Sequence, residues 1–257
     1  MLKQIKPTTP SLRHKIKIIT NLINNKNKKL SIIKKKTGGR NFLGKITVRH
    51  IGGGHKQRIN LIDNYGLNGS YTISKITNFV YDANRSNYLA LCKTPNNKEF
   101  LRLSADGQKI GDTVFGKYYP LKTSLHNSDI LPLKGIPVGT KIFNIEFNPG
   151  KGMKLARAAG VFATIIKHEN NLTTIKLSSK KIIVLSSDCL CNIGINNNIN
   201  YHNKILGKAG ANRWRGIRPT VRGEAMNPID HPHGGETSGG VRLKTVYGKL
   251  AKFIKTR

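Results

Sequence analysis

Acidic residues are scarce in this chain of 257 residues. Aspartate and glutamate together number 12, against 45 lysines and arginines, so the formal net charge is +33 and the sequence pI is about 10.4. Self-repulsion of this size destabilises a compact fold unless a polyanion neutralises it. The composition therefore predicts a long-lived nucleic-acid partner and argues against a merely soluble basic protein.

Long apolar runs and a cysteine framework are also missing. No stretch approaches the roughly 18 apolar residues of a membrane-spanning helix, and no long basic amphipathic helix indicates a membrane surface as partner. Cys92, Cys189 and Cys191 offer neither a disulfide framework nor a C-x-x-C zinc half-site. We therefore expect three reduced thiols in a reducing compartment, and no membrane partner.

The few acidic residues are unevenly placed along the chain. None precedes Asp63, and only three follow Asp188. This distribution predicts a globular centre between two basic arms, an N-terminal arm over residues 1–60 and a Gly/Arg-rich C-terminal arm over residues 201–257. Because such arms bury too little apolar surface to offset the entropy of ordering, they should order only against a partner.

The centre of the chain has the pattern of an all-β structure. "YTISKITNFVYD" (Tyr71–Asp82), the polar turn "DANRS" and "NYLALCKT" predict a hairpin, and "VFATIIK", "LTTIKL" and "KIIVLSS" follow as short strands separated by turns. Short strands at regular spacing favour a sandwich or barrel. The length allows two small barrels, over residues 61–134 and 135–200, with a boundary between Pro132 and Pro137.

Glycines and cations alternate in "KKKTGGRNFLGKITVRHIGGGHKQR". The pattern of "GKITVRH" predicts an extended segment with basic and apolar groups on opposite faces, and the glycines allow the backbone to approach phosphates closely. "GRNFLGKI" has Ile46 where a phosphate-binding loop needs a hydroxyl for magnesium, so nucleotide hydrolysis is not predicted. With an ordinary solvated basic loop as the alternative, the expected RNA-binding residues are Lys36, Arg40, Lys45, Arg49, His50, His55, Lys56 and Arg58.

Two later segments combine glycine with cations in a similar way. "NPGKGMKLARAAG" suggests either a phosphate-binding turn or a tight turn before a strand, and "GKAGANRWRGIRPTVRGEAMNP" places a tryptophan between two arginines. Indole rings and guanidinium planes can stack on bases or grip phosphates, although this tryptophan could instead anchor a small local core. The RNA-binding candidates are Lys151, Lys154 and Arg157 in the first segment, and Lys208, Arg213, Trp214, Arg215, Arg218 and Arg222 in the second.

The stretch "NPIDHPHGG" raises the question of a metal site or a catalytic base. His231 and His233 could bind zinc together with a nearby acid, but Pro232 favours a polyproline-like path that would splay them apart. The arm supplies almost no apolar walls for a pocket, so we predict neither a metal site nor a general base. The preferred interpretation is a rigid loop that fits folded RNA, with Asp230, His231 and His233 as contacts.

Seven motifs stand in order along nearly the whole chain: "KPTTPSLRH", "GRNFLGKITVRHIGGGHK", "YDANRS", "LPLKGIPVGT", "NIEFNPGKGMKLARAAG", "GKAGANRWRGIRPTVRGEAMNPIDHPHGG" and the terminal "KTR". Together they resemble the ribosomal protein L2 family in its bacterial and organellar form. The resemblance implies a mainly β fold, with an OB-like barrel followed by an SH3-like barrel and extended basic N- and C-terminal arms.

The resemblance also implies a function. It suggests a structural, non-enzymatic constituent of the large ribosomal subunit that binds large-subunit rRNA, organises the region around the peptidyl-transferase centre and supports subunit association and translation. The implied partners are large-subunit rRNA, other large-subunit ribosomal proteins and, across an intersubunit bridge, the small subunit. No cofactor and no metal ligand are expected, apart from structural Mg²⁺ that the rRNA could hold.

Individual residues take roles from the same resemblance. Arg85 in "YDANRS" joins the RNA-binding set, and the loop 230–235 is expected to lie towards the peptidyl-transferase centre. His231 is expected to position RNA. Direct participation of His231 in peptidyl transfer and an RNA-acting metalloenzyme are the alternatives, and a generic nucleic-acid-packaging protein is a third hypothesis.

The residue choice bears on the compartment. Asn, Ile and Lys crowd into stretches such as "NLINNKNKKL", which indicates AT-rich codons, and "KPTTP" begins at Lys6, which leaves almost no room for a cleaved transit peptide. We therefore expect a protein encoded in the mitochondrion and working in the mitochondrial ribosome. The cytoplasm of a low-GC bacterium is the alternative.

Overall fold

The computed structural model describes residues 2–20, 22–24, 28–65, 73–116, 126–236 and 242–251. The chain divides into two compact units, each built from segments that lie far apart in the sequence. We call the first the barrel unit, which comprises Met1–Lys35 and Lys56–Ala209, and the second the loop unit, which comprises Lys36–His55 and Gly210–Arg257.

The OB-like half of the barrel unit is a five-stranded sheet. Its strands are β3 (Ile23–Asn24), β6 (Ile73–Tyr81), β7 (Leu89–Lys93), β8 (Glu99–Leu103) and β9 (Thr113–Phe115). The long strand β6 pairs antiparallel with β7 and β9 and parallel with β3, and β7 pairs with β8. The β6–β7 hairpin confirms the prediction from "YTISKITNFVYD" and "NYLALCKT", although Tyr71 and Thr72 lie outside the described residues.

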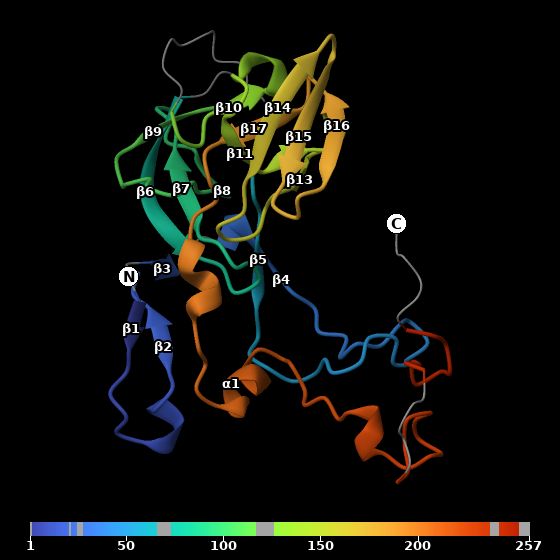
Figure 1. Ribbon diagram of the computed structural model, residues 1–257. Helices are drawn as coiled ribbons and strands as arrows, with labels where there is room; N and C mark the ends of the chain where they lie inside the picture. Colours follow the sequence, from blue (N-terminus) through green and yellow to red (C-terminus); the bar gives the residue numbers. More distant parts are fainter. Residues whose placement is uncertain are drawn as a thin grey trace. The chain divides into compact units, whose positions relative to one another are not determined.

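The SH3-like half is a six-stranded sheet, in which the strands β14 to β16 lie side by side as an antiparallel meander (Figure 1). In sheet order its strands are β10 (Ile130–Pro132), β17 (Leu190–Ile193), β11 (Lys141–Phe143), β14 (Ala163–Glu169), β15 (Leu172–Leu177) and β16 (Ile182–Ser186). The last three confirm the strands predicted from "VFATIIK", "LTTIKL" and "KIIVLSS". Asn170 takes a left-handed φ of 48° in the tight turn between β14 and β15, a conformation that asparagine tolerates well.

The apolar core is formed by these two sheets and by the short elements and turns between their strands. Among the described residues, every buried hydrophobic side chain falls between Ile76 and Ile193. Phe143 of β11 packs in the core of the first sheet, against Val80, Leu89 and others, so the two halves share one hydrophobic boundary. Cys92, Cys189 and Cys191 are free and buried in this core, as expected of reduced structural thiols.

One arginine of the first sheet is structural. Arg102 on β8 is fully buried, and its guanidinium donates a hydrogen bond to the carbonyl of Ser128. Burial lowers the pKa of Arg102, and burial raises the pKa of the neighbouring Asp129 carboxyl. This guanidinium group is therefore enclosed in the interior and is unavailable to a nucleic acid.

A network of amides joins three loops of the barrel unit. The Asn87 side chain donates to the Asn196 side chain over 3.0 Å, and Asn196 donates to the carbonyl of Arg157 over 2.8 Å. Asn197 accepts from the backbone N–H of Tyr88 and donates to its carbonyl. Because buried amides are costly to leave unpaired, this network holds the turn after β6 and the loop after β13 in one arrangement.

The remaining elements are short. They are β1 (Leu2–Gln4) paired with β2 (Ile16–Ile18), β4 (Ser31–Ile33) with β5 (Arg58–Asn60) and β12 (Ile145–Glu146) with β13 (Met153–Leu155), the 3-10 helices η1 (Pro10–Leu12), η2 (Lys28–Leu30), η4 (Leu133–Gly135), η5 (Ile199–Asn203) and η6 (Gly223–Ala225), and the helix α1 (Ala209–Trp214). Among the described residues, no helix has the length and apolar character needed to cross a membrane.

The extended strand expected over "GKITVRH" is not formed. Only Ile46 makes a β-bridge, with Arg40, and the chain turns at His50, whose φ is 61°. The carbonyl of Gly39 accepts hydrogen bonds from the N–H groups of both Thr47 and Val48, which curls the segment. The alternation of apolar and basic residues was therefore misleading, because Ile46 and Val48 are both about half-exposed and no partner sheet buries them.

Without RNA, we predict that limited proteolysis of the free chain trims both arms towards a core of roughly residues 60–200, since exposed segments with little burial are cut first. The buried apolar side chains between Ile76 and Ile193 should protect that core. Mass spectrometry of the fragments measures the boundaries of the protected core. An intact chain under conditions that degrade a denatured control would contradict this expectation.

Candidate nucleic-acid interface

Two basic segments more than 150 residues apart in the sequence run together in the loop unit. The N–H of Gly52 donates to the carbonyl of Gly216 and the N–H of Arg218 to that of His50, both over 2.9 Å. Ile51 and Ile217 form the bridge between these bonds, and the N–H of His55 donates to Trp214. This ladder brings two motifs that the sequence presents separately into one surface.

Glycine is necessary where the two segments meet. A Cβ atom on Gly54 would lie 2.6 Å from the backbone nitrogen of Gly216, and the φ of Gly54 is +79°. A Cβ atom on Gly39 would lie 2.1 Å from the carbonyl oxygen of Val48. Backbone packing therefore explains the glycines at positions 39 and 54, whereas a Cβ atom on Gly44 or Gly53 would meet open space.

Beside this ladder is a cavity of about 600 Å³. Four of the expected RNA-binding residues line it, namely Arg40, Arg49, His50 and Arg218, together with glycines, Ile46, Val48, Ile51 and Pro219. The aliphatic part of Arg218 lies over Gly52, where a Cβ atom would be 3.2 Å from its Cδ. A concave site with cations and half-exposed apolar groups suits a nucleotide, whose phosphate is charged and whose base is flat and apolar.

The cations around α1 are displayed to solvent. Arg213 and Arg215 are exposed on either side of Trp214, and Trp214 is itself 51% exposed, so it does not anchor a closed local core. Arg222 is also exposed and lies 3.7 Å from the carboxylate of Glu224, a weak surface ion pair. Of the other candidates in this unit, Lys36 donates to the carbonyl of Gly54, and Lys45 is exposed.

The loop 227–235 is curled, and its two histidines touch. The ring centroids of His231 and His233 are 4.7 Å apart at 60°, so the expectation that Pro232 would splay them was wrong. Backbone hydrogen bonds from Asp230 and His231 to the carbonyl of Asn227, and from Gly234 to that of His231, close the loop against a polyproline-like path. Among the described residues, no group of three His, Cys, Asp or Glu side chains could hold a metal ion.

His231 is the buried centre of this loop. Its residue is 8% exposed, and its Nδ1 accepts a hydrogen bond from the N–H of His233 over 3.1 Å, which leaves the proton on Nε2. The imidazole lies against Gly223, where a Cβ atom would be 2.4 Å from Nδ1. His233 accepts at Nε2 from the N–H of Lys244 over 2.9 Å, and Asp230 is exposed.

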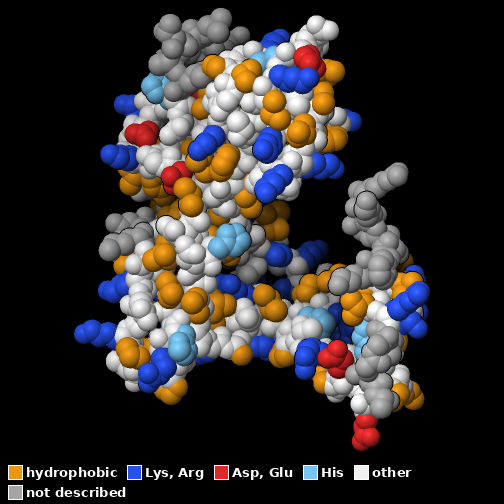
Figure 2. Space-filling view, viewed as in Figure 1, with side chains coloured by type: hydrophobic (Ala, Val, Ile, Leu, Met, Phe, Trp, Pro, Cys, Tyr) orange, Lys and Arg blue, Asp and Glu red, His pale blue; other side chains and the backbone are white. Residues whose placement is uncertain are grey.

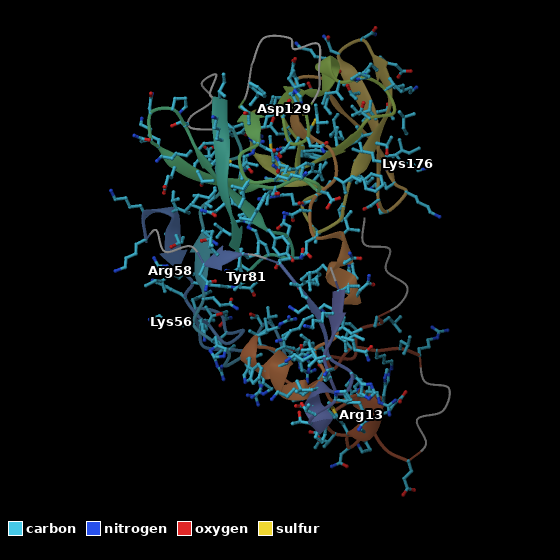
Figure 3. All side chains as sticks on the ribbon, turned by 90° about the vertical axis from the view of Figure 1, so that its left-hand side faces the viewer. Arg13, Lys56, Arg58, Tyr81, Asp129 and Lys176 are labelled. Atoms are coloured by element: carbon cyan, nitrogen blue, oxygen red, sulfur yellow. The ribbon has the colours of Figure 1, made fainter. Side chains whose placement is uncertain are left out.

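The barrel unit carries the other expected cations. Lys56 and Arg58 lie along one segment (Figure 3), and both are exposed. The Arg58 guanidinium donates to the hydroxyl and the carbonyl of Ser31, each over 2.9 Å, so its direction is set by β4. Lys151, Lys154 and Lys208 are exposed.

Arg85 and Arg157 form a cationic pair on the barrel unit. Arg85 lies 3.4 Å from the carboxylate of Asp82, and Arg157 donates to the carbonyl of Met153 over 3.1 Å. Burial and then the charge of Arg85 lower the pKa of Arg157, and its Nε has no hydrogen-bond partner in the described structure. Because burial and a nearby cation both disfavour the charged form of Arg157, an anion such as phosphate beside it would stabilise that charge.

The surface as a whole is also rich in positive charge. Lys and Arg side chains are spread over the visible face, whereas Asp and Glu are few (Figure 2). Even if each of the 12 acids paired with one cation, 33 cations would remain. What sequence reasoning missed is the pairing of the segments around Gly52 and Gly216, for which the shared richness in glycine was the only available signal.

Comparisons with known proteins cover the whole chain. The family model "Ribosomal Proteins L2, RNA binding N-terminal domain" matches residues 27–116, and "Ribosomal Proteins L2, C-terminal domain" matches residues 126–250. Large ribosomal subunit protein uL2 of Wigglesworthia glossinidia brevipalpis is 46% identical over 100% of this chain and 93% of its own length. Proteins of the same name from Buchnera aphidicola, of the Acyrthosiphon pisum (strain Tuc7) and Schizaphis graminum (strain Sg) subspecies, are 43% and 44% identical over 98% of this chain and 92% of theirs.

Replacement of Gly223 by alanine should open the loop around His231, because the new Cβ would overlap the imidazole. Overpacking of this kind costs about 1–3 kcal/mol. Modification of His231 by diethyl pyrocarbonate, followed by mass spectrometry, should be several times faster in Gly223→Ala than in the parent chain. Gly210→Ala is the matched control, since a Cβ there meets open space. Equal rates in all three proteins would refute the buried position of His231.

Proposed function

The chain belongs to the ribosomal protein L2 family, and we propose that it organises the rRNA around the peptidyl-transferase centre and supports association of the two ribosomal subunits. Its role in the large ribosomal subunit is structural, and it binds large-subunit rRNA. The observation that carries the finer proposal is the match of both family domains. It is supported by the loop unit, in which backbone hydrogen bonds and close glycine packing join the two segments that carry the cations.

The proposed partners follow from the charge and from the family. Large-subunit rRNA neutralises the cations, and other large-subunit ribosomal proteins and the small subunit, across an intersubunit bridge, are the protein and ribosomal partners. The pair Arg85 and Arg157 and the cavity with Arg40, Arg49 and Arg218 are the sites where we propose phosphate contacts. The protein itself supplies no cofactor site in this proposal, and any Mg²⁺ is held by the rRNA.

We propose that the protein is not an enzyme and that His231 positions the loop 227–235 against RNA. The support is geometric: Nδ1 of His231 is occupied by the N–H of His233, and the ring packs on Gly223. A general base needs a free nitrogen at the reacting atom. Direct participation in peptidyl transfer remains the alternative, since Nε2 of His231 would be available to donate to RNA.

The ribosome is the location that family membership implies, and the compartment is a finer proposal. The Asn-, Ile- and Lys-rich composition supports the mitochondrial ribosome. The bacterial relatives, 43% to 46% identical over essentially the full chain, support the cytoplasm of a low-GC bacterium. Whether the gene stands in an organellar or a bacterial genome distinguishes these two proposals.

Binding to large-subunit rRNA should depend steeply on salt. Six to ten phosphate contacts release enough counterions to lose on the order of 10³ to 10⁵ in affinity between 50 and 200 mM salt. Equilibrium binding of the full chain across that range measures the slope, and a DNA duplex of equal length tests for a generic packaging protein. A flat salt dependence, or equal affinity for both nucleic acids, would contradict the proposed function.

His231→Ala should weaken the loop without removing a catalyst. Loss of the acceptor for His233 N–H leaves a partly buried donor unpaired, which costs up to about 1–3 kcal/mol. His231→Asn, which restores an acceptor in a similar place, should recover most of the loss. The measurement is single-turnover peptide-bond formation in fully assembled mutant subunits, with assembly and tRNA binding checked separately.

The decisive outcome is a loss in the chemical step alone. A missing proton-transfer group costs on the order of 10² to 10⁴ in rate. Normally assembled His231→Ala subunits that bind both tRNAs but lose 10³-fold or more, on the order of that range, would favour a catalytic histidine over the positioning role.

A further inference from the structure

The tip of the loop unit at Asn41–Gly44 is a rigid turn. It is closed by the bridge between Arg40 and Ile46, and the side-chain oxygen of Asn41 accepts hydrogen bonds from the N–H groups of Leu43 and Lys45, each over 3.0 Å. Gly44 takes a φ of +76°, and its N–H donates to the carbonyl of Asn41. The conformation of the tip is therefore determined by its own hydrogen bonds.

This rigid turn presents two large apolar side chains to solvent. Phe42 is 94% exposed and Leu43 is 64% exposed. A single exposed apolar residue is ordinary and would carry no argument. Here, however, the half-exposed Ile46 and Val48 follow within six residues of Phe42, so four exposed apolar side chains lie on this turn and directly after it. Such an arrangement is that of a contact surface whose partner is absent.

Charge identifies the class of the partner. Arg40, Lys45 and Arg49 flank the tip and are exposed, and the sequence contains no acidic residue before Asp63. Arg40 and Arg49 also line the cavity beside the tip. A partner must therefore offer negative charge at short spacing and flat apolar faces between the charges, which is the chemistry of unpaired nucleotides.

We propose that Phe42 stacks on an unpaired base of the large-subunit rRNA, with Leu43 packed beside it and with Arg40, Lys45 and Arg49 on the flanking phosphates. The tip acts as a stacking wedge, whose rigidity means that little conformational entropy is lost on binding. This inference rests on the proposed rRNA binding and adds to it a base-stacking contact that does not depend on charge.

The test is equilibrium binding of the full chain to a large-subunit rRNA transcript at several salt concentrations. Stacking of a base on an aromatic side chain contributes about 1–3 kcal/mol, so Phe42→Ala should weaken binding roughly 5- to 150-fold at every salt concentration. The slope of affinity against salt should not change, because no charge is lost. Arg49→Ala, in contrast, should reduce that slope by about one contact.

Two matched variants separate stacking from general hydrophobicity. Phe42→Tyr keeps a planar ring and should bind like the parent chain, whereas Phe42→Leu keeps apolar surface without a ring and should bind like Phe42→Ala. Ile182→Ala removes an apolar side chain that is 58% exposed on β16 and should have no effect. Ultraviolet crosslinking should join the peptide containing Phe42 to RNA in the parent chain and not in Phe42→Leu.

Each outcome decides the inference. Parent-like binding by Phe42→Ala, or equal binding by the Tyr and Leu variants, would overturn the stacking wedge while leaving rRNA binding intact. A defect that appears only when other ribosomal proteins are present would mean that the tip contacts a protein, and it would overturn the inference as well. Failure of the parent chain itself to bind the transcript would instead refute the proposed function.

Discussion

Electrostatic repulsion is the constraint on which the structure of this protein depends. A net charge of +33 must be carried by a chain whose buried apolar side chains, among the described residues, all lie between Ile76 and Ile193. The two sheets stay folded against this repulsion because each has a hydrophobic core. Hydrogen bonds between buried amides join their loops. Outside this region the described residues form no comparable core, so a polyanion that neutralises the charge would stabilise those segments.

In the loop unit, backbone contacts replace a hydrophobic core. The segments around Gly52 and Gly216 are joined by main-chain hydrogen bonds, and glycines permit an approach that any side chain at Gly54 would prevent. Main-chain pairing leaves the side chains of Arg49, Trp214 and Arg218 facing outward. The same main-chain pairing thus orders the two segments and leaves their cationic side chains exposed.

The loop at His231 is also held by hydrogen bonds and by close packing on a glycine. A histidine that is mostly buried, paired to the next turn through Nδ1 and packed on Gly223, determines the shape of a loop with almost no apolar residues of its own. One ring nitrogen, Nδ1, accepts a hydrogen bond from within the loop. Hydrogen bonds and close packing on a glycine thus give this loop a defined shape without a hydrophobic core.

Composition, spacing and turn residues were sufficient to predict the β6–β7 hairpin, the strands β14 to β16 and a nucleic-acid partner, because these depend on local periodicity and on total charge. The family motifs indicated the OB-like and SH3-like barrels. The sequence misled at "GKITVRH" and at Pro232, where alternation and proline preference were overridden by backbone hydrogen bonds from distant or neighbouring turns. Only the tertiary structure decided that Gly52 meets Gly216, that His231 touches His233, and that Phe42 stands at an exposed rigid tip, since contacts between segments depend on chain geometry that no local pattern encodes.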